Sequence, residues 1–456
     1  MVRTGITGML LRKKLHNKVH KYLGYLLLAN TYAERHGVKR LAKKMLTRFK
    51  QRLKTSIVKR NLMSSTLSSV IGQDLPHWSE LNRDSQQDLN PIGVYKTKIG
   101  ESYTTIVTDS IGQNSLFGGV ATALIFGTLL ANKRDQPLRI ITRTEPGFAE
   151  SYTKLLNIYD ISLKHNLVLD FSPRSSTTPN LTYHPNDLFI TTSWWTTYSC
   201  LKRVESKSIV YLIQEDERFF YPVSDLYIEC EKIMNNPKIR YVVNSEFLWR
   251  HFEINGFKNI IENGTYFEPN FDRKILPNRT LCKEKQNLFF YARPNNPRNL
   301  YRSGIDLINK ALLLKIINPE EWNIVLVGNN IEPFRFDDGT IPQVISGLTW
   351  AEYLNLISNT DIGISLMATP HPSYPPLDLA AAGAVVITNK YGVKQTLNKY
   401  SQNILVCNLN TEDLLNGLKR AVKMCNNKNL VDENHCKSSL FRTWEECLSD
   451  SIAANL

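Results

Sequence analysis

The sequence predicts an α/β protein with two Rossmann-like domains that face each other across a cleft. Short apolar runs with the length of buried strands alternate with helical patterns, which is the order that βαβ units require. This alternation occurs twice in the 456 residues, over 104–252 and again over 287–424. Because ligands of such sheets bind at the carboxyl ends of the strands, two facing domains would share one ligand cleft.

The first domain is expected over 99–275 and begins with a strand at 104–108, followed by a Gly-containing loop. Its further elements are expected as strands at 138–142, 188–192, 209–213 and 241–244 and helices at 120–132 and 246–252.

The second domain is expected over 276–435, and a last helix within 436–456, with Trp444 as its apolar anchor, is expected to cross over from it. Its elements are expected as strands at 287–291, 322–327, 343–346, 362–367 and 384–388 and helices at 301–316, 349–358 and 411–424.

The net charge of +14 is concentrated at the N-terminus. Residues 1–60 contain 17 Lys and Arg and one acidic residue, Glu34, which gives this segment +16 and leaves −2 for the rest. Apolar residues recur every four positions within it, so 1–62 is expected to form a basic amphipathic helical arm. We expect this arm to bind an anionic membrane surface, where each basic residue contributes about 1 kcal/mol. The alternatives are packing on the protein itself and self-association.

No nucleic-acid partner is expected, because no aromatic or Gly-rich RNA module follows the arm. Residues 63–98 are rich in Ser, Asn, Gln, Asp and Pro and are interpreted as a linker. No apolar run approaches the ~18 residues of a membrane span. The seven cysteines form no CxxC pair, which fits a reducing compartment. We therefore expect a cytoplasmic protein that is peripheral at the inner face of the cell membrane.

Residues 365–389 are the most informative part of the chain. Ser373 is a candidate N-cap, the two prolines after Tyr374 suit the first turn of a helix, and Gly383 suits its end. A helix that begins at the carboxyl end of a parallel strand is a ready anion site. The segment therefore predicts a ligand with phosphate groups, with Asp378 placed beside it.

Arginines follow the strand expected at 287–291. Arg293 comes directly after it, where its guanidinium can bind phosphate oxygens with two hydrogen bonds. Arg298 and Arg302 lie further on and are weaker candidates. Gly118 and Gly119 precede a helix and allow a backbone to approach a ligand, or they form an ordinary tight turn.

The first domain offers candidates for binding a second substrate. Glu215 and Asp216 follow a strand and could orient an acceptor or serve as a base, or they belong to an exposed acidic loop. Trp194 and Trp195 could form a platform that stacks on a sugar, or they pack in the core. The sequence contains no HExxH motif, zinc spacing or DxD motif, so neither a metal nor a cofactor is expected.

Three motifs resemble the WsaF-type rhamnosyltransferases, which are two-domain GT-B glycosyltransferases that build rhamnose-containing bacterial surface glycans. They are HPSYPPLDLAAAG with the following VVITN, QEDERFFYP, and VVNSEFL. The resemblance implies a nucleotide-sugar donor, dTDP-β-L-rhamnose, bound in the second domain. It implies a glycan or lipid-linked glycan as the acceptor, bound in the first domain.

The resemblance also implies roles for single residues. Arg293 would hold the diphosphate, Tyr374 would line the donor pocket and Asp378 would bind the ribose or the sugar. Gly118–Gly119 would form the loop that faces the donor. Two positions depart from the family pattern: Asp378 is usually Glu, and Gly347 replaces a basic residue, whose phosphate contact Arg298 or Arg302 could supply.

The expected function is a metal-independent, retaining transfer of L-rhamnose to a surface glycan, with Arg293 and Asp378 in the catalytic centre. An inverting transfer would need a base, for which Asp216, Glu215, Asp109 and His184 are candidates. The alternatives are a transferase of another nucleotide sugar, a GT-B-like sugar-nucleotide epimerase, and a non-catalytic glycan-assembly scaffold at the membrane.

Overall fold

The computed structural model describes residues 87–112, 118–271, 275–277 and 283–456. The chain divides into two units, 1–81 and 82–456, and the account below concerns the second. The arm expected over 1–62 and residues 63–86 of the expected linker lie outside the described residues.

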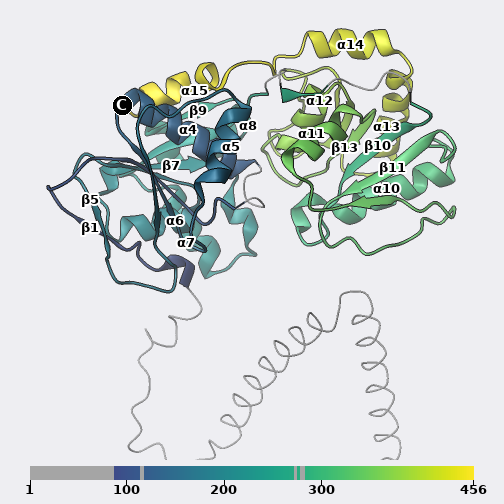
Figure 1. Cartoon of the computed structure of the whole chain (residues 1–456). Coiled ribbons are helices and arrows are strands. Elements are labelled where there is room, and N and C mark those ends of the chain that lie inside the picture. Colours follow the sequence, from purple (N-terminus) through teal and green to yellow (C-terminus); the bar gives the residue numbers. More distant parts are fainter. Residues whose placement is uncertain (1–86, 113–117, 272–274, 278–282) are drawn as a thin grey trace, which may run out of the picture. The chain divides into compact units, whose positions relative to one another are not determined.

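The first half of this unit is built on a seven-stranded parallel sheet in the order β4-β3-β2-β6-β7-β8-β9 (Figure 1). Its strands are β2 Thr104–Thr108, β3 Leu138–Thr142, β4 Leu167–Phe171, β6 Leu188–Thr191, β7 Ile209–Ile213, β8 Arg240–Asn244 and β9 Gly264–Phe267. Its helices are α4 Gly119–Arg134, α5 Ala149–Ile158, α6 Trp194–Leu201, α7 Asp225–Met234, α8 Glu246–Ile254 and α9 Lys258–Glu262.

The second half is built on a six-stranded parallel sheet in the order β12-β11-β10-β13-β14-β15. Its strands are β10 Gln286–Tyr291, β11 Trp322–Val327, β12 Gln343–Ile345, β13 Ile362–Ile364, β14 Val385–Asn389 and β15 Ile404–Cys407. Its helices are α10 Tyr301–Leu313, α11 Trp350–Ser358, α12 Tyr374–Ala381, α13 Thr411–Cys425 and α14 Lys428–Cys436.

Both sheets have the strand order of a dinucleotide-binding fold. Counted along the chain, the strands of the second sheet lie in the order 3-2-1-4-5-6, and the first sheet repeats this order with one more strand at its edge. The order reverses between β2 and β6 in one sheet and between β10 and β13 in the other. Ligands of doubly wound sheets bind at these switch points, outside the carboxyl ends of the strands. The predicted fold class is confirmed.

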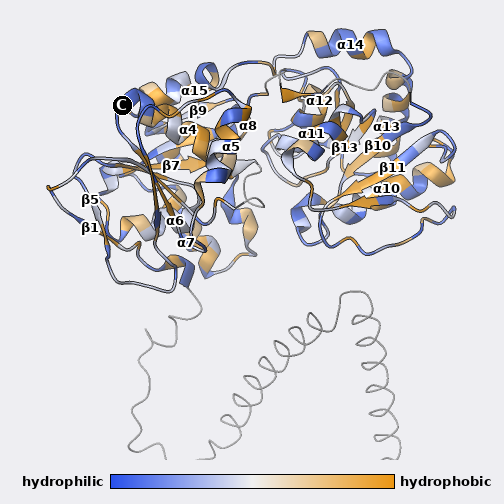
Figure 2. Cartoon of the chain, viewed as in Figure 1, coloured by the Kyte–Doolittle hydropathy of each residue, from blue (hydrophilic) through white to orange (hydrophobic). Residues whose placement is uncertain are grey.

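Both faces of each sheet are buried. Ile106 and Val107 are neighbours in β2 but belong to separate apolar clusters on opposite faces, and Phe290 and Phe289 in β10 do the same. In Figure 2 the strands are largely orange, whereas the helices around them alternate between orange and blue. Close packing fixes some positions: a Cβ added to Gly304 in α10 would lie 2.1 Å from the Phe290 ring.

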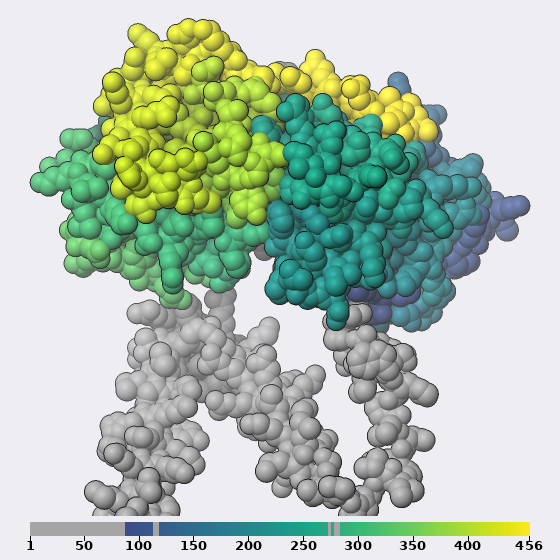
Figure 3. Space-filling view, turned by 180° about the vertical axis from the view of Figure 1, so that it is seen from behind, coloured from purple at the N-terminus to yellow at the C-terminus, as the bar shows by residue number. Residues whose placement is uncertain are grey.

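The C-terminal segment returns to the first half, as expected for a crossover helix. Helix α15, Trp444–Ala453, packs with Leu448 and Ile452 in the same apolar cluster as α4. The ring of Trp444 meets that of Tyr159 edge to face at 5.9 Å between centroids. Figure 3 shows this yellow segment extending over the teal residues of the first half.

Two expectations about local structure need correction. Residues 87–98 were expected to belong to a linker, but β1, Val94–Lys96, pairs with β5, Leu181–Tyr183, and Ile92 is fully buried. The strand expected at 362–367 ends at Ile364. Beyond it the side chain of Asn389 accepts a hydrogen bond from the Met367 N–H at 2.7 Å and donates one to the Met367 carbonyl at 3.1 Å.

Within the described part of the chain, no helix is both long and apolar enough to span a membrane.

Candidate functional site

A cavity of about 690 Å³ is lined by both halves of the unit. The first half contributes the start of α4, the end of α5 and Trp444, and the second half contributes the residues before α11 and the start of α12. Because α4 follows β2 and α12 follows β13, the cavity lies beside both switch points. The position is the one at which this fold binds ligands.

Tyr374 joins the two halves at one wall of this cavity. Its hydroxyl accepts a hydrogen bond from Asn244 Nδ2 at 2.8 Å and lies 2.6 Å from Thr122 Oγ1. Thr122 in turn donates to the Gly118 carbonyl at 3.0 Å, so Tyr374 is the donor to Thr122. Gly118 has φ 65°, and a Cβ there would stand 3.5 Å from the Tyr374 ring. The structure thus brings Gly118 and Tyr374 together at the cavity, and their roles toward a donor stay predictions.

Gly119 is the first residue of α4 and its carbonyl accepts a hydrogen bond from Gln214 Nε2 at 2.6 Å. It is not among the residues that line the cavity. Of the predicted glycine pair, Gly118 therefore approaches the cavity and Gly119 fixes the start of the helix.

Asp378 lines the cavity from the first turns of α12 and is 7% exposed. Its Oδ2 accepts a hydrogen bond from the Tyr353 hydroxyl at 2.7 Å. Burial raises the pKa of Asp378 to about 7, and the Tyr353 hydrogen bond opposes this shift. A carboxyl group in this setting can accept hydrogen bonds from the hydroxyls of a ligand.

The start of α12 differs from the expectation in its cap. Ser373 occupies the N-cap position, but its side chain makes no capping hydrogen bond, because its Oγ points to the Met367 sulfur at 2.9 Å. The Ser373 N–H instead donates to Nδ1 of His371 at 2.9 Å. The first N–H groups of α12 are therefore not capped by Ser373, and the prolines remove donors that would otherwise need partners.

Two buried basic residues lie close behind this loop. His371 is 5% exposed, its Nε2 has no hydrogen-bond partner in the described residues, and burial lowers its pKa to about 3. Lys394 is fully buried, its Nζ lies 3.4 Å from the Met367 carbonyl, and burial lowers its pKa to about 7. No sequence pattern indicates that Lys394 is buried, because a lysine beside a turn is normally exposed.

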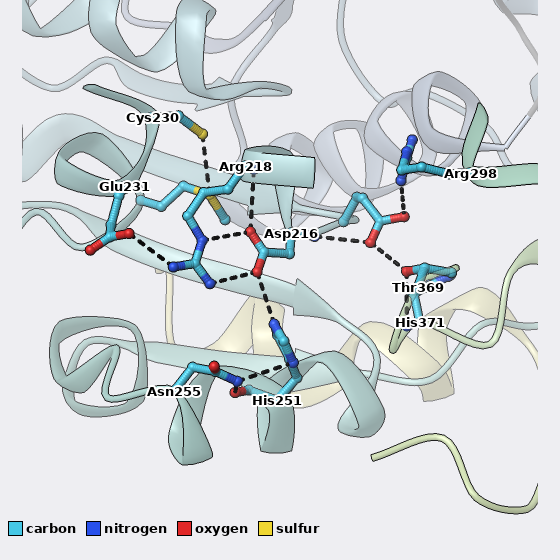
Figure 4. Close-up of polar contacts among 11 residues, drawn as sticks. Asp216, Arg218, Cys230, Glu231, His251, Asn255, Arg298, Thr369 and His371 are labelled. Atoms are coloured by element: carbon cyan, nitrogen blue, oxygen red, sulfur yellow. Dashed lines mark hydrogen bonds and ion pairs between the residues drawn. The ribbon is translucent and has the colours of Figure 1, made fainter. Parts of the chain in front are cut away.

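The predicted arginines lie in different surroundings. Arg293 is exposed, and its guanidinium carbon stands 6.0 Å from the centroid of the Tyr291 ring. Arg298 is mostly buried and pairs with Glu215 Oε2 at 2.6 Å, while the other oxygen of Glu215 accepts from Thr369 (Figure 4). Burial raises the pKa of Glu215, and Arg298 opposes this shift. Glu215 therefore connects the end of β7 to the second half.

Asp216 lies on the side of Arg218 and His251, away from Arg298 and Thr369 (Figure 4). It is fully buried and accepts two hydrogen bonds from the Arg218 guanidinium, at 2.9 and 2.7 Å, and contacts His251 Nε2 at 2.8 Å. Burial alone would raise its pKa, but the bonds from Arg218 and His251 outweigh it and the pKa is lowered. The structure therefore does not place Asp216 where a substrate reaches it, contrary to its expected role.

Trp194 is also misassigned as a sugar-stacking residue. It is 1% exposed, and its indole N–H donates to the Tyr221 hydroxyl at 3.0 Å. Its ring is packed inside the first half, which is the alternative that the sequence left open. No group of three or more His, Cys, Asp or Glu residues in the described ranges is arranged to hold a metal ion.

The chain matches two family models. The model described as "WsaF, N-terminal domain" matches residues 104–246, and "WsaF, C-terminal domain" matches residues 286–419. The O-antigen biosynthesis protein RfbC of Myxococcus xanthus is 26% identical over 245 residues, which are 52% of this chain and 18% of that protein. The chain therefore spans less than a fifth of this relative's length.

Solved structures share the fold at low sequence identity. HepE of Anabaena, in complex with UDP and glucose, is 12% identical with a TM-score of 0.54, over 77% of this chain and 99% of HepE. OtsA is 10% identical with a TM-score of 0.51, over 77% of this chain and 99% of OtsA. The ranges matched by the two family models make up more than half of the sequence, so the chain belongs to the WsaF family and has the two-domain GT-B fold.

Proposed function

We propose that this protein is a metal-independent glycosyltransferase that moves L-rhamnose from dTDP-β-L-rhamnose to a bacterial surface glycan. One observation carries the proposal: the cavity at both switch points combines the start of α12, Asp378 and Tyr374 with Gly118 of the opposite half. The family membership supports a transferase, and the name of the relative RfbC supports a role in surface polysaccharide assembly. The complex of HepE with UDP and glucose supports a nucleotide-sugar donor.

The cavity wall suits the nucleoside part of such a donor. It includes the apolar side chains of Phe271, Leu348 and Trp350, against which a base can pack. Asp378 would accept a hydrogen bond from a ribose or sugar hydroxyl on the same wall. The diphosphate would then lie at the start of α12, where the helix dipole favours negative charge.

In the proposed transfer, an acceptor hydroxyl oxygen forms a bond to the anomeric carbon of the donor sugar. The bond from that carbon to the diphosphate oxygen breaks, and the electron pair leaves with the diphosphate. Arg293 and the start of α12 would stabilise the charge that develops there. In a retaining reaction the acceptor proton passes to the departing phosphate oxygen, so no protein base is needed. The buried position of Asp216 removes one of the candidate bases that an inverting reaction would need.

A thermal-shift experiment with dTDP-, UDP- and GDP-sugars tests the donor assignment. A donor that binds only the folded protein raises its melting temperature by mass action, and we expect the largest rise with dTDP-rhamnose. Asp378→Ala should reduce this rise. A protein that no nucleotide sugar stabilises would instead favour the non-catalytic scaffold.

Turnover tests the role of Arg293. Arg293→Ala should lower kcat/KM by about a hundredfold or more, because an arginine that stabilises the leaving group is worth several kcal/mol. Arg335→Ala, which removes another exposed arginine of the second half, is the matched control.

Two further measurements separate the alternative reactions. Nucleotide release only in the presence of an acceptor glycan would exclude the epimerase, and product NMR would separate retention from inversion.

We also propose that the basic segment 1–60 holds the enzyme at an anionic membrane surface. Its +16 charge supports this proposal. The full chain should float with phosphatidylserine vesicles at low salt and lose this binding at high salt, since surface charge is screened. A chain that lacks residues 1–60 should stay at the bottom of the gradient, and flotation of that shorter chain would contradict the proposal.

A further inference from the structure

The carboxyl edge of the first sheet carries a second group of aromatic and charged side chains, apart from the cavity. Asp109 follows β2, Arg174 lies beyond β4, Trp195 is in the first turn of α6 after β6, and Phe220 lies beyond β7. The strands that precede these residues are parallel, so their carboxyl ends meet at one edge of the sheet. The fold therefore gathers four residues that are spread over more than a hundred positions of the sequence, from Asp109 to Phe220.

Hydrogen bonds and an ion pair hold these side chains in place. The Trp195 indole N–H donates to Asp109 Oδ2 at 2.9 Å, and Arg174 NH2 pairs with Asp109 Oδ1 at 2.7 Å. The Asp109 and Arg174 side chains remain 29% and 23% exposed, although Asp109 Oδ1 itself is buried and Arg174 also pairs with Asp88. Both side chains are thus fixed in direction and partly exposed.

The aromatic rings form a surface beside these polar groups. The rings of Trp195 and Phe220 lie 6.3 Å apart at 53°, and Phe220 is 41% exposed. The buried Trp194 supports Trp195 from behind through an edge-to-face contact at 6.3 Å. A large apolar ring that stays exposed on a rigid base is typical of a binding surface rather than of a core.

This surface reaches the second half of the unit. The guanidinium carbon of Arg298 stands 4.7 Å from the centroid of the Phe220 ring, and Arg298 is paired with Glu215. Arg298 and Arg293 follow the same strand, β10, and the proposed function assigns Arg293 to the charge on the diphosphate. A molecule that rests on Trp195 and Phe220 would therefore lie next to the reacting end of the donor.

We infer that Trp195 and Phe220, with Asp109 and Arg174 at their side, bind the terminal pyranose ring of the acceptor glycan. This inference rests on the proposed function and names the acceptor subsite of the same enzyme. A pyranose has an apolar face of C–H groups and a rim of hydroxyls. The rings match the face, and the carboxylate and guanidinium match the rim. Of the two tryptophans that the sequence offers as a platform, Trp195 keeps this role and Trp194 packs in the core.

Binding of simple sugars tests the subsite without knowledge of the natural acceptor. The probes are millimolar methyl glycosides of rhamnose, glucose, galactose and mannose, observed by saturation-transfer NMR with the full chain. We expect transfer to the ring protons of at least one glycoside. Trp195→Ala and Phe220→Ala should each weaken its binding by about tenfold, which corresponds to about 1.4 kcal/mol.

Tyr266→Ala is the matched control, because Tyr266 is 42% exposed on β9 at the far edge of the same sheet. It should leave glycoside binding unchanged. Phe220→Ala keeps the test valid even if Trp195→Ala fails to fold, since Phe220 is largely outside the core. A wild-type chain that binds none of the glycosides, or a Phe220→Ala chain that binds them as well as wild type, would overturn the inference.

The same samples separate this inference from the proposed function. Stabilisation by a nucleotide sugar should be equal in wild type and Trp195→Ala, because Trp195 does not line the donor cavity. If a nucleotide sugar stabilises the protein but the variants bind the glycosides as well as wild type does, only the acceptor subsite is contradicted. If no nucleotide sugar stabilises the wild-type protein, the proposed function is contradicted, whether or not the glycosides bind.

Discussion

Asp378 and Asp216 are both buried aspartates at the carboxyl ends of parallel strands, yet their surroundings are opposite. Asp378 is 7% exposed, has the neutral Tyr353 hydroxyl as partner and borders an open cavity. Asp216 is fully buried between the Arg218 guanidinium and the His251 ring. Burial raises the pKa of Asp378 to about 7, whereas the hydrogen bonds from Arg218 and His251 overcome burial and lower the pKa of Asp216.

The difference separates a binding group from a structural one. A buried carboxylate that is matched by cations has its hydrogen bonds satisfied and holds the fold, and removal of one partner leaves a buried charge. A buried carboxyl group that faces a cavity with a neutral partner is costly to ionise. Such a group is stabilised when a ligand supplies further hydrogen bonds, and perturbed groups of this kind gather at functional sites.

The largest effect should come from Asp216→Ala. Arg218 would lose its buried partner, and the free energy of unfolding at pH 7 should fall by about 3 to 5 kcal/mol. Urea unfolding measures this loss, and Asp216→Asn should lose less because it keeps one acceptor oxygen. A loss below about 1 kcal/mol for Asp216→Ala, the size of an exposed ion pair, would contradict the structural role.

The next effect is a pH dependence of opposite sign at the two residues. The folded pKa of Asp378 is raised from 3.8 to about 7, so the folded state binds the proton more tightly. Relative to Asp378→Asn, wild type should therefore lose about 1.4 kcal/mol of unfolding free energy for each pH unit between these two values. Above pH 7 the difference should stay constant.

Asp216 should behave in the opposite way, because its folded pKa is lowered. Its contribution to stability is present above the ordinary pKa of 3.8 and is lost only as the pH falls through the lowered value. Urea titrations of wild type, Asp378→Asn and Asp216→Asn from pH 2 to pH 8 compare the two. If the difference in unfolding free energy between wild type and Asp378→Asn does not change with pH, the two carboxyl groups do not differ as we expect.

A smaller effect should follow Tyr353→Phe. The Tyr353 hydroxyl lowers the pKa of Asp378 against the effect of burial, so its removal should move the pH window of Asp378 upward. At pH 8, where the carboxyl group is ionised in wild type, the variant should lose about 1 to 3 kcal/mol of unfolding free energy. Below pH 5, where the group is protonated, the loss should be smaller.

The part of the cavity wall that α12 forms could be predicted because its residues are close in sequence. Tyr374 and Asp378 lie within one turn-and-helix segment, and the prolines and Gly383 set the bounds of that helix. The doubly wound sheets followed from the alternation of apolar strands and helices in the same way. Local chemistry alone determines such features.

The side chains at the carboxyl edge of the first sheet could not be predicted residue by residue, because neighbours in sequence point in opposite directions. Trp194 is buried and Trp195 is half-buried on the same turn of α6, since successive residues of a helix are turned by about 100°. Glu215 and Asp216 diverge in the same way after β7. Which member of each pair faces a substrate depends on the packing of distant segments. The sequence also gave no sign that Lys394 would be buried.

The smallest effect should come from Glu231→Gln, which tests the comparison at a single arginine. Arg218 pairs with Asp216 on its buried side and with Glu231 at 2.9 Å, but the Glu231 side chain is 50% exposed. Water screens this second pair, so its removal should change the free energy of unfolding by about 0.5 kcal/mol or less. The same guanidinium would then show a large coupling to one carboxylate and almost none to the other. A Glu231→Gln chain that is as unstable as Asp216→Ala would mean that burial does not decide which carboxylate holds the fold.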